Sequence, residues 1–146
     1  MKGEFKPIFL LQFIVLFSLG CKNPVHNKEE VEKAMQTYDQ LILNMDVDSI
    51  SYMYTPDGDL GNIAHGRDSI RNLLEKFKHF KVLSQISRSD SVLIDHDTAI
   101  QVGIYHQTTI VSANDTESVN GTFRVRWIWS KETGWQIKHM ETASAK

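Results

Sequence analysis

Residues 119–129 read VNGTFRVRWIW, and apolar side chains alternate there with polar ones more regularly than anywhere else in the chain. Phe123, Val125 and Trp127 fall on one side of this stretch. A period of two residues predicts a β-strand that buries one face and exposes the other. We therefore expect a sheet with one face in the core.

Two further strands are predicted upstream. Residues 82–94 are strand-like, and turn-forming residues at 95–97 and 113–116 separate the strands. Residues 98–111 alternate as well, and one face consists of Ile100, Val102, Ile104, His106, Thr108 and Ile110. This face is expected to point into the domain.

A last strand is predicted downstream. A hairpin at 131–134 leads into it, and one face holds Trp135, Ile137 and His139. Strands joined by such short turns indicate an antiparallel meander.

Helices are predicted before the sheet. Residues 28–45 place apolar side chains three and four positions apart and carry acidic residues in the first turn, as an amphipathic helix does. A second, short helix should begin at Asp46 or Asp48 and stop before Pro56, and its apolar residues are Ile50, Met53 and Tyr54.

Residues 55–59 have the composition of a turn, and a short extended piece is expected at 60–65. A third helix should open at Arg67 or Asp68, with one face made of Ile70, Leu73, Leu74 and Phe77. Helices followed by a meander indicate an α+β domain, in which three helices pack on one face of a curved, mostly antiparallel sheet.

The first twenty residues have a different character. The run at 8–19 is apolar except for Gln12 and Ser18, and two lysines precede it. As a helix this run would span about 18 Å, which is less than the ~30 Å hydrocarbon core of a membrane. Residues 1–20 are therefore predicted to be a cleaved export signal.

The chain's one cysteine follows this run. Ser18-Leu-Gly-Cys21 resembles the lipobox of bacterial lipoproteins, although leucine is usual where Ser18 stands. The resemblance implies lipidation of Cys21, residues 21–28 as a tether, and a protein anchored in the bacterial cell envelope that faces the periplasm or the exterior. The alternative is ordinary cleavage after Gly20, which would yield a secreted protein.

The composition also excludes classes of protein. A formal net charge of −2 does not provide the basic excess that nucleic acid requires, so no nucleic-acid partner is expected. One cysteine cannot form an intrachain disulfide or a multi-thiolate zinc site. No cofactor and no metal site are predicted.

Several motifs occur in an order that resembles the nuclear transport factor 2-like superfamily, in particular its SnoaL-like bacterial branch. After the first helix they are Asn44-Met-Asp-Val-Asp-Ser-Ile, Tyr54-Thr-Pro-Asp-Gly-Asp, Gly66-Arg-Asp-Ser-Ile and Trp127-Ile-Trp…Gly134-Trp-Gln-Ile. The resemblance covers residues 29–142 and leaves a tail at 143–146. It implies a cone-shaped cavity between the helices and the sheet, and homodimers formed through the sheet, but no single activity.

The catalytic residues of one branch of that superfamily are largely missing. Its ketosteroid isomerases use an aspartate base, a tyrosine on the first helix and a protonated aspartate on a late strand. The matching positions are Asn62, Tyr38 and either Gly121 or Thr122. An amide does not abstract a proton, and glycine or threonine does not replace a protonated carboxyl group, so this isomerase activity is not expected.

The predicted cavity has two alternative chemistries. His106 and His139 can form an acid–base group with Tyr38 or Tyr54, although a histidine on an apolar strand face is more often a structural polar group. The same histidines with Glu141 are the residues that a metal would need. The expected lining comprises Tyr38, Tyr54, Asn62, Phe77, Ile104, His106, Phe123, Val125, Trp127 and His139.

The leading interpretation is an envelope lipoprotein whose domain binds a small apolar ligand or a protein partner without catalysis. An enzyme of the lyase, isomerase or hydrolase class, acting through the histidines and a tyrosine, is the main alternative. A homodimerisation module presented at the membrane is the third.

The variant Cys21→Ala tests the anchor. Because the sulfur atom of Cys21 would carry the lipid, the variant should move from the membrane fraction to the soluble fraction, as followed by immunoblotting. A variant that stays in the membrane fraction would show that Cys21 is not the anchor.

Overall fold

The structure is a computed structural model that describes residues 26–113 and 115–145. The predictions about the export signal and Cys21 lie outside these residues. In the described part of the chain, no helix has the length and apolar content needed to cross a bilayer. The elements are α1 (Lys28–Asn44), α2 (Val47–Tyr52), β1 (Tyr54–Leu60), β2 (Ala64–His65), α3 (Arg67–Glu75), β3 (Lys81–Asp95), β4 (Thr98–Ser112), β5 (Asp115–Ser130) and β6 (Gly134–Ser144).

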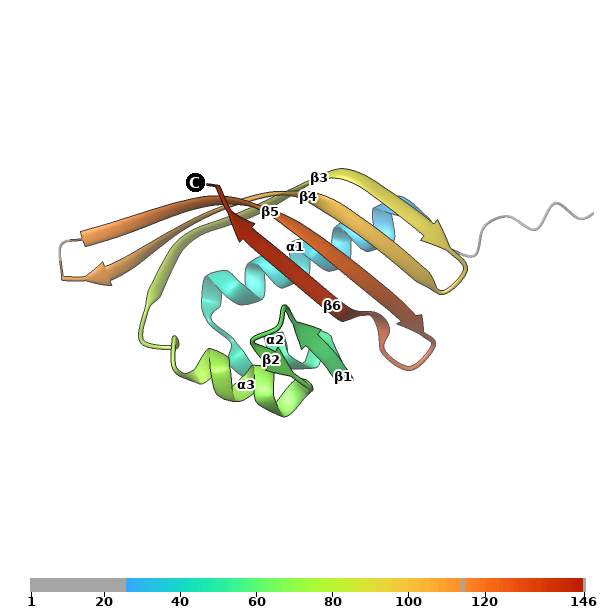
Figure 1. Cartoon of the computed structure of the whole chain (residues 1–146), viewed down its shortest axis with the longest axis horizontal. Helices are drawn as coiled ribbons and strands as arrows, with labels where there is room; N and C mark the ends of the chain where they lie inside the picture. Colours follow the sequence, from blue (N-terminus) through green and yellow to red (C-terminus); the bar gives the residue numbers. More distant parts are fainter. Residues whose placement is uncertain (1–25, 114, 146) are drawn as a thin grey trace, which may run out of the picture.

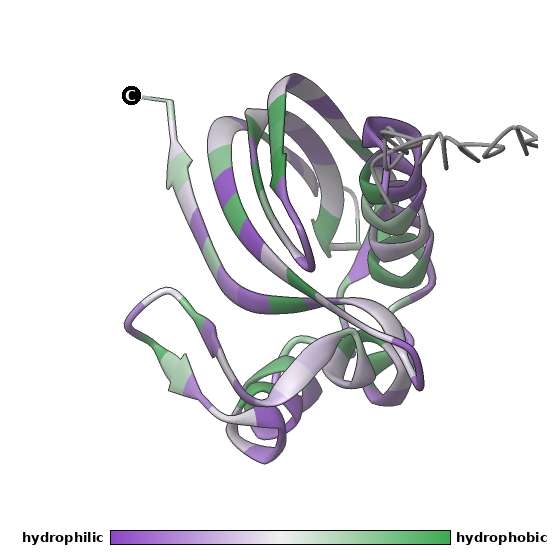
Figure 2. Ribbon diagram, turned by 90° about the vertical axis from the view of Figure 1, so that its right-hand side faces the viewer, coloured by the Kyte–Doolittle hydropathy of each residue, from purple (hydrophilic) through white to green (hydrophobic). Residues whose placement is uncertain are grey.

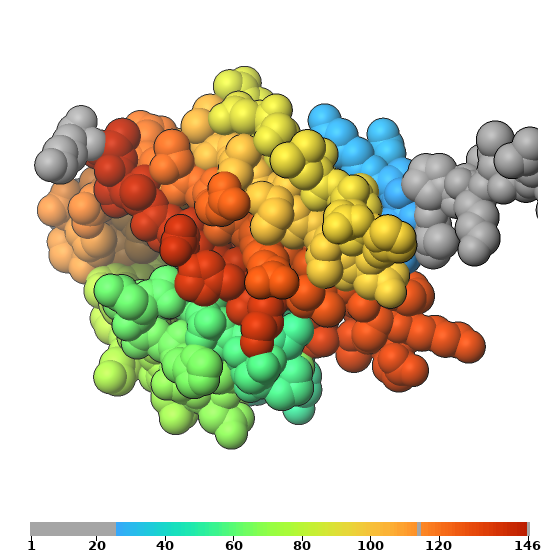
Figure 3. All heavy atoms as spheres, turned by 45° about the vertical axis from the view of Figure 1, so that its right-hand side comes forward, coloured from blue at the N-terminus to red at the C-terminus, as the bar shows by residue number. Residues whose placement is uncertain are grey.

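The strands form a single sheet in the order β2-β1-β6-β5-β4-β3. All neighbours are antiparallel except β1 and β6, which run parallel. Figure 3 shows β6 in red between β5 and the green segment that holds β1 and β2. The predicted α+β class, with helices on a mostly antiparallel curved sheet, is confirmed.

Helix α1 lies against the concave face of the sheet, whereas α2 and α3 lie near β1 and β2 (Figure 1). Asn27 caps α1 by accepting a hydrogen bond from the backbone N–H of Glu30, and Asp46 caps α2 in the same way through Ser49. Figure 2 shows how strongly the strands curve beside α1. The helix buries Val31, Met35, Tyr38, Asp39 and Ile42.

Two local predictions upstream of the sheet are wrong. Tyr54 is not in the second helix but is the first residue of β1, and residues 55–59 are part of that strand instead of a turn. Phe77 lies beyond the end of α3 and is exposed, because α3 stops at Glu75. Tyr54, Asp59 and Leu60 pair with β6, a long-range contact that no local pattern reveals, and the segment between them is extended although its composition favours a turn.

The faces of β4 are the reverse of those predicted. Ala99, Gln101 and Gly103 are buried on the concave side, so the stripe that holds Ile104 and His106 lies on the convex side. The β4–β5 register shifts by one residue between Ile110 and Ser112. Such a bulge turns every following side chain to the other face.

A second bulge acts in the same way on β6. Arg126 pairs with His139 and Trp127 pairs with Ile137, so Lys138 is the additional residue. Trp135 and Ile137 face the concave side as predicted, but beyond the bulge this side is taken by Met140. His139 therefore lies on the convex side.

Two cross-strand pairs of an aromatic residue and a glycine shape the concave face. Gly103 pairs with Phe123 and Gly121 pairs with Tyr105. A Cβ atom on Gly121 would lie 2.5 Å from Cε1 of Tyr105, and one on Gly103 would lie 2.8 Å from Cζ of Phe123. Each ring therefore lies directly over the glycine of the neighbouring strand, in space that a larger residue would fill.

Candidate functional site

A cavity of about 190 Å³ lies between the second half of α1 and the concave face of the sheet. Every strand except β2 contributes to its wall. Most of the lining is apolar or aromatic, and the polar groups are uncharged. The lining residues are Met35, Tyr38, Ile42, Leu60, Gln85, Ser87, Tyr105, Gln107, Phe123, Met140 and Thr142.

The polar side of the cavity is held by a buried carboxylate. Asp39 on α1 is only 6% exposed. Its Oδ2 accepts the backbone N–H of Ser87 at 2.7 Å, and its Oδ1 accepts the Ser87 hydroxyl at 2.8 Å and the Gln85 amide at 3.1 Å. Because β3 is an edge strand, that backbone N–H has no neighbouring strand to bond to on its outer side. Asp39 thereby ties α1 to the edge of the sheet.

Two tyrosine side chains meet in the core beside the cavity, and one of them, Tyr38, lines it. The hydroxyl groups of Tyr38 and Tyr54 are 3.3 Å apart, and the Tyr54 hydroxyl also donates to Sδ of Met140 at 3.5 Å. Burial raises the pKa of Tyr38 to about 12, and it raises the pKa of Tyr54 as well. Both phenols therefore stay protonated at neutral pH and act as hydrogen-bonding groups rather than as bases.

The structure brings together only part of the predicted lining. Tyr38 and Phe123 line the cavity as expected. Tyr54, Val125 and Trp127 are fully buried in the core and do not reach the lining. The Trp127 indole donates to the buried amide oxygen of Gln101 at 2.9 Å, so its polar atom is satisfied inside the core.

The remaining predicted lining residues lie outside the cavity. Ile104 and His106 are on the convex face, where His106 contacts Asn120 at 2.7 Å. The β6 bulge places His139 on the convex face too. Asn62 is exposed in the turn between β1 and β2, and Phe77 is exposed after α3.

The histidine-based acid–base group is therefore not formed. His106 lies opposite Asn120, and His139 lies opposite Arg126, six residues further along β5. That separation is roughly 20 Å at the rise of a β-strand. Neither histidine shares the cavity with Tyr38. Within residues 26–113 and 115–145, no three His, Cys, Asp or Glu side chains are grouped to hold a metal ion, so the alternative of His106, His139 and Glu141 is not assembled.

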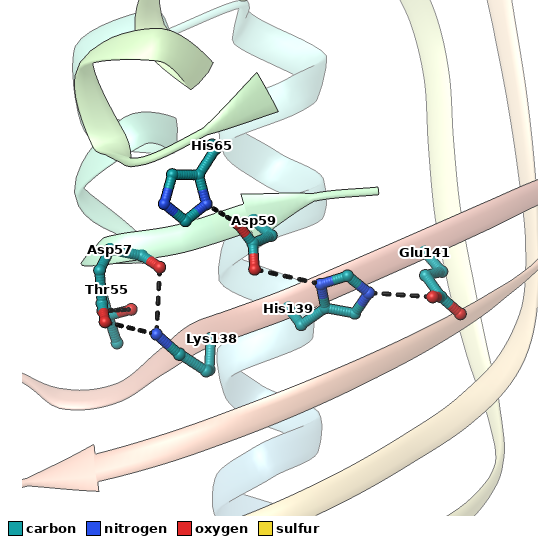
Figure 4. Close-up of polar contacts among 7 residues, drawn as sticks. All are labelled: Thr55, Asp57, Asp59, His65, Lys138, His139 and Glu141. Carbon is teal, nitrogen blue, oxygen red and sulfur yellow. Dashed lines mark hydrogen bonds and ion pairs between the residues drawn. The ribbon is translucent and has the colours of Figure 1, made fainter. Parts of the chain in front are cut away.

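A second polar cluster joins β1, β2 and β6 on the surface (Figure 4). Asp59 contacts His65 on one side and His139 at 3.5 Å on the other, and His139 contacts Glu141 at 2.9 Å. The hydrogen bond from His65 lowers the pKa of Asp59. The side chain of His65 is 81% exposed, so water reaches the cluster freely.

A neighbouring ion pair in Figure 4 joins the same two strands. Lys138, the additional residue of the β6 bulge, contacts Oδ2 of Asp57 at 2.6 Å and donates to its carbonyl oxygen at 3.1 Å. The hydrogen bond from Lys138 to the carboxylate lowers the pKa of the Asp57 carboxyl group. The Lys138–Asp57 ion pair and the cluster around Asp59 thus connect β1 to β6 on the surface.

Sequence reasoning missed most of the cavity. The residues of β4 that line it, Tyr105 and Gln107, belong to the less apolar face of that strand, so the alternation favoured the wrong side. A signal was present for Asp39, because it is an acidic residue on the apolar face of an amphipathic helix, between Met35 and Ile42. Such a residue needs buried hydrogen-bond partners.

Solved structures of other proteins share this fold. No protein-family model and no curated protein match the chain. Solved structures do match. One from Xanthomonas campestris, assigned as a calcium/calmodulin dependent protein kinase II association domain, has a TM-score of 0.73 at 20% identity, covering 82% of this chain and 89% of that one.

Two further matches have related descriptions. An NTF2-like protein with a cystatin-like fold from Novosphingobium aromaticivorans has a TM-score of 0.69 at 19% identity, covering 81% of each chain. A ketosteroid isomerase-like protein from Erwinia carotovora atroseptica has a TM-score of 0.70 at 18% identity, covering 83% of this chain and 99% of that one. The fold is therefore the nuclear transport factor 2-like cone. Proteins with this fold have different activities, so function has to be argued from the cavity.

The buried Tyr38 should make stability depend on alkaline pH. The unfolded chain ionises this phenol near its ordinary pKa of 10, whereas the folded chain holds it protonated to about 12. The free energy of unfolding should therefore fall as the pH rises from 10 to 12, by roughly 2 kcal/mol for this group.

Urea unfolding at several pH values measures this dependence. Tyr38→Phe should fall less steeply than the parent protein between pH 10 and 12, whereas Tyr52→Phe, at an exposed position, should keep the parent slope. Equal slopes for Tyr38→Phe and the parent would contradict the assigned environment of Tyr38.

Proposed function

We propose that this protein is a cell-envelope lipoprotein whose cone cavity binds a small amphipathic molecule without chemically changing it. The observation that carries the proposal is the lining of the cavity. None of the residues described as lining it is a carboxylate, imidazole, thiol or amine, which are the usual groups for acid–base or nucleophilic chemistry.

The volume of the cavity indicates the size of the ligand part that it can enclose. Pockets for drug-sized molecules usually enclose about 300–1,000 Å³, whereas an apolar cavity of about 150 Å³ accepts benzene. A cavity of about 190 Å³ thus suits a single-ring or short branched molecule. Gln85, Ser87 and Gln107 lie on one side of this space, which favours a molecule with one polar end.

Blocking the cavity tests the proposal. Thr142 is an exposed lining residue near the end of β6, and Ala143 follows it on the opposite face. Thr142→Trp should fill the entrance and weaken binding of single-ring probes such as phenol and benzyl alcohol by about tenfold or more, measured by NMR titration. Ala143→Trp adds the same bulk outside the cavity and should bind them like the parent.

If Thr142→Trp binds the probes as well as the parent does, the cavity is not where they bind. If no single-ring probe binds the parent protein, the proposed function is wrong.

The envelope location rests on the export signal and on Cys21. Where the described chain begins, His26 is buried between Trp129 and Trp135, with ring centroids 4.4 and 5.0 Å away. An anchor at Cys21 would leave four residues before this point, which reach at most roughly 17 Å to His26. The lipid would thus hold the domain close to the membrane, next to the end of the sheet that carries the two tryptophans.

We also propose that two copies associate through the convex face of the sheet. This face exposes Ile86, Leu93 and Ile104, which are 60%, 69% and 39% exposed. Apolar side chains on a broad, regular sheet face are typical of an interface between copies. The description of the Xanthomonas neighbour as an association domain adds support.

Light scattering over a range of concentrations tests this association. Ile86→Glu places a charge on the convex face and should lower the measured mass toward that of a monomer. Ile63 is 69% exposed on the β1–β2 turn rather than on β3 or β4, so Ile63→Glu should leave the mass unchanged. A parent protein that is monomeric at every concentration would contradict the proposal.

A further inference from the structure

The cavity adjoins a negative charge that no described cation neutralises. Asp39 is 6% exposed, and its three hydrogen-bond donors, on Ser87 and Gln85, are all uncharged. The ion pairs among residues 26–113 and 115–145 all involve other carboxylates. A buried carboxylate without a cationic partner attracts positive charge strongly, because little water is present to screen it.

The field of this carboxylate reaches the wall of the cavity. The charge of Asp39 contributes, after burial, to the raised pKa of the Tyr38 phenol, whose ionised form would carry a second negative charge nearby. Tyr38 lines the cavity, and so do both residues that bind Asp39 directly. A ligand in the cavity therefore lies in the same negative potential.

The hydrogen bonds have a direction that adds to this effect. The Ser87 hydroxyl and the Gln85 amide nitrogen both donate to Asp39, which leaves the hydroxyl lone pairs and the Gln85 amide oxygen as acceptors. These acceptors favour a ligand end that donates hydrogen bonds. Gln107 offers both a donor and an acceptor and so does not discriminate.

The rest of the lining suits a cation with an apolar body. The aromatic rings of Tyr38, Tyr105 and Phe123 line the cavity, and aromatic faces attract organic cations. Met35 and Met140 add apolar, polarisable surface. A carboxylate ligand would instead meet the charge of Asp39 without a compensating basic group.

We propose that the cavity is selective for a small organic cation, an amine with a single-ring or branched alkyl body, whose ammonium group lies beside Ser87 and Gln85 and is neutralised by Asp39. This inference rests on the proposed function of the cavity as a small-molecule site. It adds the charge of the ligand and names Asp39 as the residue that determines this selectivity.

Three probes of nearly equal size test the inference at neutral pH. Benzylamine is a cation there, benzyl alcohol is neutral and benzoate is an anion, and dissociation constants for the full chain in detergent are measured by NMR titration. Benzylamine should bind about tenfold more tightly than benzyl alcohol, and benzoate should bind most weakly. Benzyl alcohol or benzoate binding as tightly as benzylamine would overturn the inference while leaving a small-molecule site in place.

Removing the charge of Asp39 tests whether this residue causes the preference for benzylamine. Asp39→Asn keeps the size of the side chain, and the affinities for benzylamine and benzyl alcohol should then agree within about twofold. Asp90→Asn removes a charge from an exposed position on β3 outside the lining and should keep the tenfold preference. A preference that survives in Asp39→Asn would overturn the role of this carboxylate.

A second variant covers the case in which Asp39→Asn does not fold. Gln85→Lys supplies an ammonium group from the protein itself, so it should abolish the preference for benzylamine. Ser91→Lys adds the same group at an exposed position on β3 outside the lining and should keep the preference. Unchanged selectivity in Gln85→Lys would contradict the inference. If none of the three probes binds the parent protein, the proposed small-molecule function fails first, and the inference falls with it.

Discussion

The hydrogen bonds of Asp39 join the first helix to the edge of the sheet, and this attachment holds together two walls of the cavity. Asp39 accepts the outward N–H of Ser87 on β3, which would otherwise need water or another strand. The same bonds orient Ser87 and Gln85 toward the cavity. One buried carboxylate thus closes the cone on one side and sets the potential inside it. A structural role and a role in selectivity are here carried by one group.

The cavity also requires a curved sheet. The rings of Tyr105 and Phe123 lie over Gly121 and Gly103 of the neighbouring strands, so the glycines make room for aromatic side chains that form the cavity wall. Bulges in the strands bend the sheet further around α1 (Figure 2). Because the fold by itself does not specify an activity, the lining of the cavity and the charge behind it carry the functional argument.

The elements that could be predicted from the sequence are those with a strong local pattern. The helix at 28–45 and the inward face of residues 123–127 are confirmed, because a period of 3.6 or 2 is visible within a single segment. The strand at Tyr54–Leu60 was missed, because Pro56 and Gly58 favour a turn, whereas the pairing of its two ends with β6 is a long-range contact.

For the candidate site, the features that the sequence determines differ clearly from those that only the tertiary structure decides. The sequence alone determined that the chain builds an α+β cone, that Tyr38 and Phe123 face its interior, and that its composition does not suit nucleic acid. Only the tertiary structure decided which faces of β4 and β6 point inward. A tight turn at 113–114 without a bulge would have placed Ile104 opposite Phe123, but the extra residue between Ile110 and Ser112 puts Gly103 there instead. A bulge depends on both paired strands, and a shift of one residue reverses every side chain beyond it.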